Sequence, residues 1–565
     1  MLRRVSVRLP ILAILVAQVT IPQEAAAQHR IFDLDGAAAG DRLGASVASV
    51  GDVNNDGYPD VIIGSPYDDT TKGVDSGSAR VLSGRDGSVL FTFEGDSANA
   101  GFGGAVAGAG DVDGDGVPDI IIGAGLDDTT GTDAGSVWVV SGLSGLPIYT
   151  LYGTGSGDYF GCAVDGAGDF NSDGFADFVI GAMGFDNRGN LDSGMAEVYS
   201  GLDGDVLFTF NGFAAGDEFG CAVAGIGDFN GNHFPDVAIG AKGSDFFGLD
   251  AGSIDVFTSK GGFRESRFYG DTLHAGFGIS IDGLGDINGD RQTDIIVGAA
   301  GDATWVAGGG SARVISGKGG MVLDTFYGKA ANDEFGTAVA GGGDVDQDGF
   351  IDYIVGVPGD DANGVDAGSV RVISGFDQST IHEFRGATAG GLFGSAVGNP
   401  GDVNGDGHGD VVAGAWSSDT AGADAGGVRV LSGKALTLWS DTHELSWVGA
   451  GTQNLSIDAG AAHAGRQYWM FGSVTGTQPG TPFGGVSIPL NLDTWTLIEL
   501  SFLNTPTFSS FQGQLDSSGQ AAASINLPAG LPAALGFTMY HAYVVHNANL
   551  VPFMASNAVT LHLRD

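Results

Sequence analysis

The stretch of sequence that decides the fold is Asp111-Val112-Asp113-Gly114-Asp115-Gly116-Val117-Pro118-Asp119. Carboxylates stand at its first, third, fifth and ninth positions. A hard dication such as Ca²⁺ takes about six to eight oxygen ligands, and alternate residues of a tight loop can supply them. The glycine at the sixth position permits the positive-φ turn that brings the ninth residue back toward the ion. The stretch therefore predicts a calcium-binding loop.

This loop recurs along the chain, and the copies begin at Asp52, Asp111, Asp169, Asp228, Asp286, Asp344 and Asp402. The steps between these numbers are 59, 58, 59, 58, 58 and 58 residues. A fixed period of this size indicates one supersecondary unit repeated seven times. Each unit opens with a Phe-Gly or Leu-Gly pair and continues with a short apolar run, the acidic loop, and three further strand-like runs separated by turn residues.

Each unit therefore reads as four short strands, without a helical period anywhere. Seven four-stranded units are typical of a β-propeller, a closed ring that leaves only short strand edges exposed. The predicted fold class is all-β, a seven-bladed β-propeller followed by a small β-sandwich domain. The first strand of each blade carries small residues, which suit crowding near the axis, and the loop between strands one and two would hold the ion.

Each loop would offer side-chain oxygens from positions one, three, five and nine and a backbone carbonyl from position seven. The predicted ligand sets, loop by loop, are Asp52, Asn54, Asp56, Tyr58 and Asp60; Asp111, Asp113, Asp115, Val117 and Asp119; Asp169, Asn171, Asp173, Phe175 and Asp177; Asp228, Asn230, Asn232, Phe234 and Asp236; Asp286, Asn288, Asp290, Gln292 and Asp294; Asp344, Asp346, Asp348, Phe350 and Asp352; and Asp402, Asn404, Asp406, His408 and Asp410.

The loops differ in the number of carboxylates and in the residue at the sixth position. The second and sixth carry four carboxylates, whereas the first, third and seventh carry three and an amide. The fifth has Arg291 in place of the glycine, and the fourth has two carboxylates and His233 at that place. We expect up to seven Ca²⁺ ions, with the fourth loop weakest and the fifth next. The alternative for any loop is an Asx-rich hairpin without metal.

The Phe-Gly pair, the acidic loop and the Gly-Ala/Ser-Pro-like triplet after it resemble the FG-GAP repeats of the integrin α-subunit head. Gly64-Ser65-Pro66 and Gly356-Val357-Pro358 are the nearest triplets, and the others lack the proline. The resemblance covers roughly residues 30 to 440. It implies a seven-bladed propeller that binds Ca²⁺ and serves adhesion or ligand binding, without naming the ligand. Because nearly every blade here has a metal loop, the chain is more similar to bacterial secreted members than to integrins.

Residues 30–36 match the fourth-strand segment of the later units but precede the first blade. We expect this segment to supply the outer strand of the seventh blade and close the ring, as the resemblance implies. The rival segment is 435–439, which could close that blade locally.

The loops on the face opposite the metal loops carry a second series of aspartates, for which we expect a structural role in capping turns. Aromatic residues lie among them: Tyr67, Phe185, Phe246, Phe247, Trp305 and Trp416. In the FG-GAP family this face receives ligands, so these are candidate ligand contacts that could stack on a sugar or anchor a protein. The alternative is packing between blades.

Residues 1–27 read as a signal peptide. Arg3, Arg4 and Arg8 precede an apolar run over 9–19, and Ala25-Ala26-Ala27 offers a small-residue cleavage site. The alternative is a membrane anchor, but the run is shorter than the roughly 20 residues of a span. We expect a secreted protein, extracellular or periplasmic, either released or held at the cell surface, with no membrane span after signal cleavage.

Charge restricts the partners. The chain has 68 Asp and Glu against 23 Lys and Arg, a net charge of −45. Phosphate binding needs a basic surface, so this balance argues against nucleic acid and anionic membranes.

The two cysteines, Cys162 and Cys221, follow the Phe-Gly pair in successive blades. We expect small buried thiols, with a bridge between neighbouring blades as the alternative.

The predicted domains are a signal peptide over 1–27, the propeller over 28–441 and a sandwich-like domain over 442–565. No nucleophile elbow, zinc-protease motif or phosphate loop is found in the sequence, so we do not expect an enzyme. The predicted function is Ca²⁺-dependent adhesion or ligand binding, with an extracellular protein or glycan as partner. The alternatives are a lectin-like propeller or, at lower weight, a Ca²⁺-dependent polysaccharide lyase or hydrolase.

Overall fold

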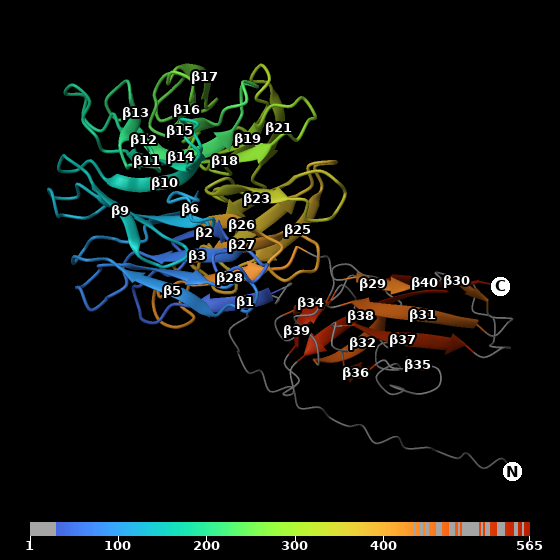
Figure 1. Cartoon of the computed structure of the whole chain (residues 1–565). Coiled ribbons are helices and arrows are strands. Elements are labelled where there is room, and N and C mark those ends of the chain that lie inside the picture. Colours follow the sequence, from blue (N-terminus) through green and yellow to red (C-terminus); the bar gives the residue numbers. More distant parts are fainter. Residues whose placement is uncertain are drawn as a thin grey trace, which may run out of the picture.

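The computed structural model describes residues 30–433 without a gap and, after them, separate strand segments between 437 and 564 (Figure 1). The described residues form strands and turns and contain no helix. The predicted signal peptide, 1–27, lies outside the described residues.

Residues 30–433 form seven four-stranded antiparallel sheets, the blades. From first to fourth strand they are β2 (Ser46–Gly51), β3 (Asp60–Ser65), β4 (Ser78–Leu82) and β5 (Val89–Glu94); β6 (Ala105–Gly110), β7 (Asp119–Ala124), β8 (Ser136–Val140) and β9 (Pro147–Tyr152); β10 (Phe160–Gly168), β11 (Asp177–Ala182), β12 (Met195–Tyr199) and β13 (Val206–Asn211); β14 (Phe219–Gly227), β15 (Asp236–Ala241), β16 (Ser253–Thr258) and β17 (Arg264–Tyr269); β18 (Ser280–Gly285), β19 (Asp294–Ala299), β20 (Ser311–Ile315) and β21 (Val322–Tyr327); β22 (Val339–Gly343), β23 (Asp352–Val357), β24 (Ser369–Ile373) and β25 (Thr380–Arg385); and β26 (Ala396–Gly401), β27 (Asp410–Gly414), β28 (Gly427–Leu431) and β1 (Arg30–Asp35).

The blades close into a ring. The first strand of each blade contacts the first strand of the next, and β2 contacts both β6 and β26. The N-terminal strand β1 pairs antiparallel with β28, so that Phe32 faces Val430 and Leu34 faces Val428 (Figure 1). The predicted closure by residues 30–36 is therefore confirmed. The rival segment does not close the ring, because β29 (Thr437–Ser440) pairs with a later strand, β31 (Gly451–Asp458).

The core lies between blades. The second strand of each blade is an apolar run buried along its whole length, as in β7, where all six residues are buried. One cluster joins Ile62 and Val81 of the first blade to Phe102, Ile120 and Ile122 of the second. A strand covered by a blade on each side needs apolar residues on both faces, which explains runs such as Ile120-Ile121-Ile122.

The Phe-Gly pair sets the spacing of the blades. Phe102 is 1% exposed and forms a parallel bridge with Gly77 of the preceding blade. Gly103 has φ +84°, and a Cβ there would lie 2.4 Å from the carbonyl oxygen of Ser78. The next glycine across, Gly64, would place a Cβ 1.9 Å from the Gly103 carbonyl oxygen. Only glycine permits this approach of one backbone to another.

The strands after residue 436 form three further sheets. One contains β29, β31, β37 (Gln520–Leu527) and β35 (Phe508–Ser509). The second contains β30 (Glu444–Ser446), β40 (Val559–Arg564), β38 (Phe537–His546), β32 (Gln467–Ser473), β36 (Gln512–Gln514) and β39 (Pro552–Ala555), and the third pairs β33 (Thr481–Phe483) with β34 (Val486–Ile488). The sandwich packing and the domain limits stay predictions.

Candidate metal sites

Each acidic loop joins the first strand of a blade to the second, and its backbone needs glycine-like conformations. In the second blade, a bulge at Gly110 (φ +77°) ends the pairing of β6 with β7. Gly114 and Gly116 then take φ of +75° and +88°. These positive angles turn the chain so that alternate side chains of the loop point to one side.

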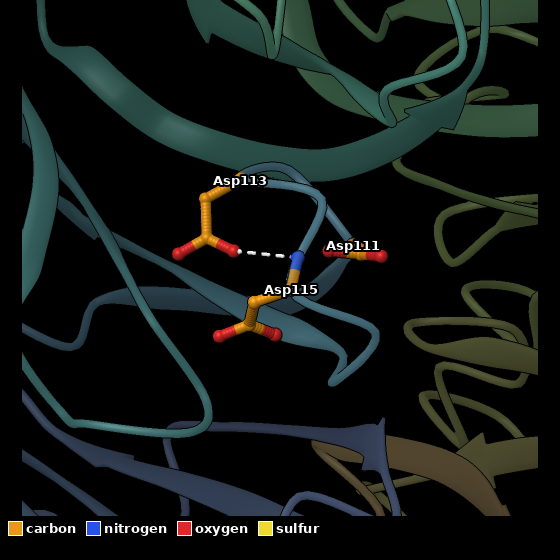
Figure 2. Close-up of side chains that lie close together, drawn as sticks. All are labelled: Asp111, Asp113 and Asp115. Carbon is orange, nitrogen blue, oxygen red and sulfur yellow. Dashed lines mark hydrogen bonds between the residues drawn. The ribbon is translucent and has the colours of Figure 1, made fainter.

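The second and sixth loops each gather three carboxylates. Oxygens of Asp111, Asp113 and Asp115 lie within 4.8 Å of one another. Figure 2 shows these three side chains on their loop. The sixth loop places Asp344, Asp346 and Asp348 in the same way. Among the residues that the structure describes, these are the two groups of this kind. Burial and then the charges of Asp115 and Asp111 raise the pKa of Asp113 above its usual value. A bound dication would remove this repulsion.

One oxygen in each of these two loops has no partner. Asp111 Oδ2 accepts the N–H of Gly116 at 3.0 Å, but Asp111 Oδ1 is buried and accepts no hydrogen bond. The same holds for Asp344 Oδ1. In the other five loops the equivalent oxygen accepts the N–H of the fifth residue, as between Asp52 Oδ1 and Asp56 at 3.0 Å.

A buried carboxylate oxygen without a donor costs about 1–3 kcal/mol, or more because it is charged. A cation is the partner that would remove this cost. The residues of the second and sixth loops therefore fit a hard dication, on donor chemistry as well as on geometry.

The ninth aspartate of every loop is an anchor of the backbone. All seven are fully buried. Asp119 Oδ2 accepts the N–H groups of Val112 and Asp113 at 2.8 and 3.2 Å, and its Oδ1 accepts that of Gly142, just after β8, at 2.9 Å. Burial raises the pKa of Asp119 to about 6, against the opposing effect of these hydrogen bonds. The ninth carboxylate thus ties the loop to the third strand, and it stands outside the three-carboxylate group.

The position-seven residues line the same loops. The N–H of Val117 donates to Asp115 Oδ1 at 2.8 Å, and that of Phe350 donates to Asp348 Oδ1 at 2.9 Å. Ligation by the carbonyls of position seven stays a prediction.

The fourth and fifth loops carry features that oppose a metal. His233 and Arg291 take φ of 68° and 71° at the position where the other loops have glycine. His233 Nδ1 lies 3.6 Å from Asp228 Oδ2, and Asn232 Nδ2 donates outward to Thr258 Oγ1 at 3.2 Å. In the fifth loop Asn288 Nδ2 donates to Ser316 Oγ at 3.0 Å. The ranking, in which the fourth and fifth loops are weakest, stays a prediction.

On the opposite face the six aromatic candidates fall into two groups. Tyr67 and Trp416 hold Arg42 between them, with its guanidinium carbon 4.6 and 4.7 Å from their ring centroids. Phe185 packs against a buried cluster. By contrast, Phe246, Phe247 and Trp305 are 69%, 66% and 75% exposed. The first three thus serve packing, whereas the last three are largely exposed and contact one neighbouring tyrosine each, Tyr269 for Phe246 and Phe247 and Tyr327 for Trp305.

The second series of aspartates caps turns, as predicted. Asp133 has φ 50°, and its N–H donates to Asp128 Oδ1 at 2.8 Å. Ser136 Oγ donates to Asp127 Oδ2 at 2.6 Å. The bond between the Asp133 N–H and Asp128 is of the side-chain to backbone kind that stabilises tight turns, and neither bond needs a metal.

The two cysteines are free thiols. Cys162 Sγ lies 3.6 Å from the Gly220 carbonyl oxygen and Cys221 Sγ 3.8 Å from that of Gly278, each in the next blade. Burial raises the pKa of Cys162 to about 12 and that of Cys221 to about 11. Both therefore act as small packing residues of the inner strands, which is the reading that the sequence favoured.

Two carboxylates on the inner strands escaped the sequence analysis. Asp165 in β10 accepts the N–H of Gly225 at 2.9 Å, and Asp282 in β18 accepts that of Gly341 at 2.9 Å, so each links its blade to the next. Burial raises the pKa of Asp165 to about 7, with a further contribution from the charge of Asp282, whose own pKa burial raises to about 6. The other blades have alanine or glycine at this position. An aspartate in place of these small residues was the sequence signal that could have identified Asp165 and Asp282.

These two groups predict a pH dependence of stability. The folded-state pKa values of Asp165 and Asp282 lie above 3.8, so the stability that these two groups contribute is fully present below about pH 4. This stability is lost as the pH rises through about 6 to 7. Replacing both by asparagine, which keeps an acceptor oxygen, is expected to stabilise the chain at pH 8 by on the order of 1–2 kcal/mol and to change little at pH 4. Denaturant titrations in chelator at both pH values measure this; an equal effect at the two would contradict it.

A membrane-spanning helix is not found among the residues that the structure describes.

Comparison with known proteins agrees with the architecture. The FG-GAP repeat model matches residues 43–82, 102–140 and 163–196. Integrin alpha-V of Gallus gallus is 31% identical over 216 residues, which is 36% of this chain and 20% of the relative. Integrin alpha-5 of Xenopus laevis is 32% identical over 191 residues, 30% of this chain and 18% of the relative. The chain thus spans about a fifth of the length of these relatives. Three FG-GAP repeats are thus matched within a chain whose residues 30–433 form a closed ring of seven blades, and about a third of the chain is similar in sequence to integrin α subunits.

Proposed function

We propose that this protein is an exported, Ca²⁺-stabilised propeller that binds a ligand outside the cell and acts in adhesion. The observation that carries the metal part is the pair of buried oxygens, Asp111 Oδ1 and Asp344 Oδ1, that accept no hydrogen bond. They lie in the two loops that gather three carboxylates.

Asp111, Asp113 and Asp115 would hold one ion, and Asp344, Asp346 and Asp348 a second. When bound, Ca²⁺ supplies positive charge and ties the first and fifth residues of a loop together. The loops of the first, third and seventh blades are weaker candidates, because the oxygen of their first aspartate already has a backbone partner. Extracellular modules commonly bind Ca²⁺ with Kd of roughly 10⁻⁴ to 10⁻³ M, which suits such open sites.

The ligand-binding part rests on three exposed aromatic residues and on the integrin α relatives. Phe246, Phe247 and Trp305 lie on the two neighbouring blades four and five, and each is more than three-fifths exposed. Exposed aromatic side chains grouped on one face commonly mark an interaction site. Export is proposed from the signal-like residues 1–27, and the proposal assigns no catalytic step.

Calorimetric titration of the metal-free chain with Ca²⁺ tests the metal part. We expect at least two saturable sites, and an Asp115→Ala, Asp348→Ala double variant should lose two. Asn230→Ala, in the weak fourth loop, is the matched control and should lose none. Saturable uptake that is the same in the double variant and the wild type would contradict the assignment.

A binding screen tests the ligand part. The immobilised chain is offered extracellular-matrix proteins and a glycan array, in Ca²⁺ and in chelator. We expect a saturable ligand whose binding weakens when Ca²⁺ is removed. Failure of every probe in both buffers would count against a role in adhesion.

A further inference from the structure

The third strands of blades five, six and seven carry an arginine at the same register: Arg313, Arg371 and Arg429. Each guanidinium carbon lies over the phenylalanine of a Phe-Gly pair, at 4.9, 5.5 and 5.0 Å from the ring centroid. Arg313 also reaches the end of the preceding blade. It donates to the Tyr269 carbonyl oxygen at 3.2 Å and to Asp271 Oδ2 at 2.6 Å. An ion pair therefore closes the junction of blades four and five.

The next junction lacks this pair. Asp271 stands two residues after Tyr269, the last residue of β17, and the residue two places after Tyr327, the last of β21, is Lys329. Lys329 therefore stands, relative to Arg371, at the sequence position that Asp271 occupies relative to Arg313. Arg371 is 4% exposed, and its Nε is buried with no hydrogen-bond acceptor. Its nearest carboxylate oxygens, on Glu383 and Asp360, lie at 3.9 and 4.0 Å, beyond hydrogen-bond reach.

Three cations surround the carboxylate of Glu383 at this junction. Glu383 lies 3.3 Å from Lys329, 2.7 Å from Arg385 and 3.9 Å from Arg371. Burial raises the pKa of Glu383, but the hydrogen bond from Arg385 and the charges of Arg385, Lys329 and Arg371 outweigh it and hold that pKa below its usual value.

The remaining acids at the junction are already engaged. Asp360 accepts from Ser369 Oγ at 2.6 Å, and Asp324 accepts from Gln378. In a chain of net charge −45, the charged side chains that line the recess at this junction are nonetheless two cations, Lys329 and Arg371.

An open groove of about 460 Å³ lies here, between the fourth strand of blade five and the third and fourth strands of blade six. Its walls include Trp305, Tyr327, Lys329, Arg371 and Gln378. Trp305 is 75% exposed and stacks on Tyr327, with centroids 6.1 Å apart and planes at 24°. The groove thus combines a flat aromatic platform, two cations and one side-chain amide within one recess.

We propose that this groove, the junction groove, binds an acidic saccharide, with the carboxylate of a uronate residue on Lys329 and Arg371 and the sugar ring against Trp305. The inference rests on the proposed ligand-binding function and names the class of ligand.

The chemistry of the walls supports a sugar. The C–H face of a pyranose is complementary to the negative face of an indole, and the ring hydroxyls can bond to Gln378 and to neighbouring threonines. A guanidinium and an ammonium together select a carboxylate over a neutral hydroxyl. Because the rest of the chain is strongly acidic, the favourable charge contacts for an acidic saccharide are confined to the groove.

Titration of the full chain with tetragalacturonate, in saturating Ca²⁺ and followed by tryptophan fluorescence and calorimetry, tests the proposal. Neutral chitotetraose and tetraglutamate are the comparison probes. We expect tetragalacturonate to bind at least tenfold more tightly than either, and added salt to weaken it. Equal binding of chitotetraose, or tighter binding of tetraglutamate, would overturn the uronate assignment.

Three variants test which side chains of the groove bind tetragalacturonate. Trp305→Ala should weaken binding at least tenfold. Lys329→Asp rebuilds at this junction the ion pair that Arg313 makes with Asp271, so it should fold with an unchanged or higher melting temperature and yet lose tetragalacturonate binding. Phe263→Ala removes a comparably exposed aromatic from the loop between β16 and β17 and should bind as the wild type does. If the Lys329→Asp variant binds tetragalacturonate as tightly as the wild type does, the proposal is wrong.

The outcomes separate this inference from the proposed function. If the chain takes up Ca²⁺ and binds another extracellular ligand but not tetragalacturonate, the junction groove is overturned and the proposed function stands. If tetragalacturonate binds with the expected variant pattern but Ca²⁺ uptake is absent, the groove stands and the metal assignment fails.

Discussion

Replacing Asp119 by alanine is expected to lower the free energy of unfolding by on the order of 4 kcal/mol, in Ca²⁺ and in chelator alike. Asp119 is fully buried and accepts three backbone N–H groups, from Val112, Asp113 and Gly142. Alanine would leave these donors without an acceptor, at about 1–3 kcal/mol each. Denaturant titrations with and without Ca²⁺ measure the effect.

Asp115→Ala is the matched control for this prediction. Asp115 belongs to the same loop but is exposed, and it lies in the three-carboxylate group. Its loss should destabilise the chain only when Ca²⁺ is present. If Asp119→Ala also acts only in Ca²⁺, the ninth aspartate is a metal ligand alone and its anchoring role is wrong.

Saturating Ca²⁺ is expected to stabilise the propeller by on the order of 5 kcal/mol through the second and sixth loops together. An ion present at about a hundred times its Kd adds about 2.7 kcal/mol for each site that exists only in the folded state. With Kd of roughly 10⁻⁴ M, 10 mM Ca²⁺ reaches that ratio approximately. Differential scanning calorimetry in 10 mM Ca²⁺ and in chelator should show a clear upward shift of the melting temperature.

The Asp115→Ala, Asp348→Ala double variant should lose most of this shift, and Asn230→Ala should keep it. Mg²⁺ at the same concentration should stabilise less, because it prefers a small octahedral shell and keeps its waters. A melting temperature that is the same in Ca²⁺ and in chelator would contradict the metal assignment of both loops.

Much of the fold was predictable from local pattern. The period of 58 or 59 residues and the repeated Phe-Gly pair indicated seven equal blades, because one packing solution repeated along a chain must use the same residues each time. The segment 30–36 could be assigned to the last blade because it repeats the fourth-strand pattern out of turn. The second and sixth loops stood out by their carboxylate count, and they are the two whose carboxylates the structure groups.

The roles of single residues within those loops were less accessible. Positions one and nine are aspartate in every copy, so sequence could not distinguish them. The structure separates them by burial and hydrogen bonding: Asp119 anchors three backbone N–H groups, whereas Asp111 keeps a buried oxygen without a partner. That difference depends on where the third strand passes, which is set by the pairing of β7 with β8.

The sequence by itself determined the repeat, the four strands of each blade and the oxygen donors of the loops, since these depend on neighbours within a few residues. Only the tertiary structure decided which aromatic side chains stay exposed, which aspartates link inner strands, and that Lys329 faces Arg371 in a groove. Such contacts join residues about forty to sixty positions apart, across two blades. They follow from the register of one sheet against the next, which the glycines of the Phe-Gly pairs allow to come close.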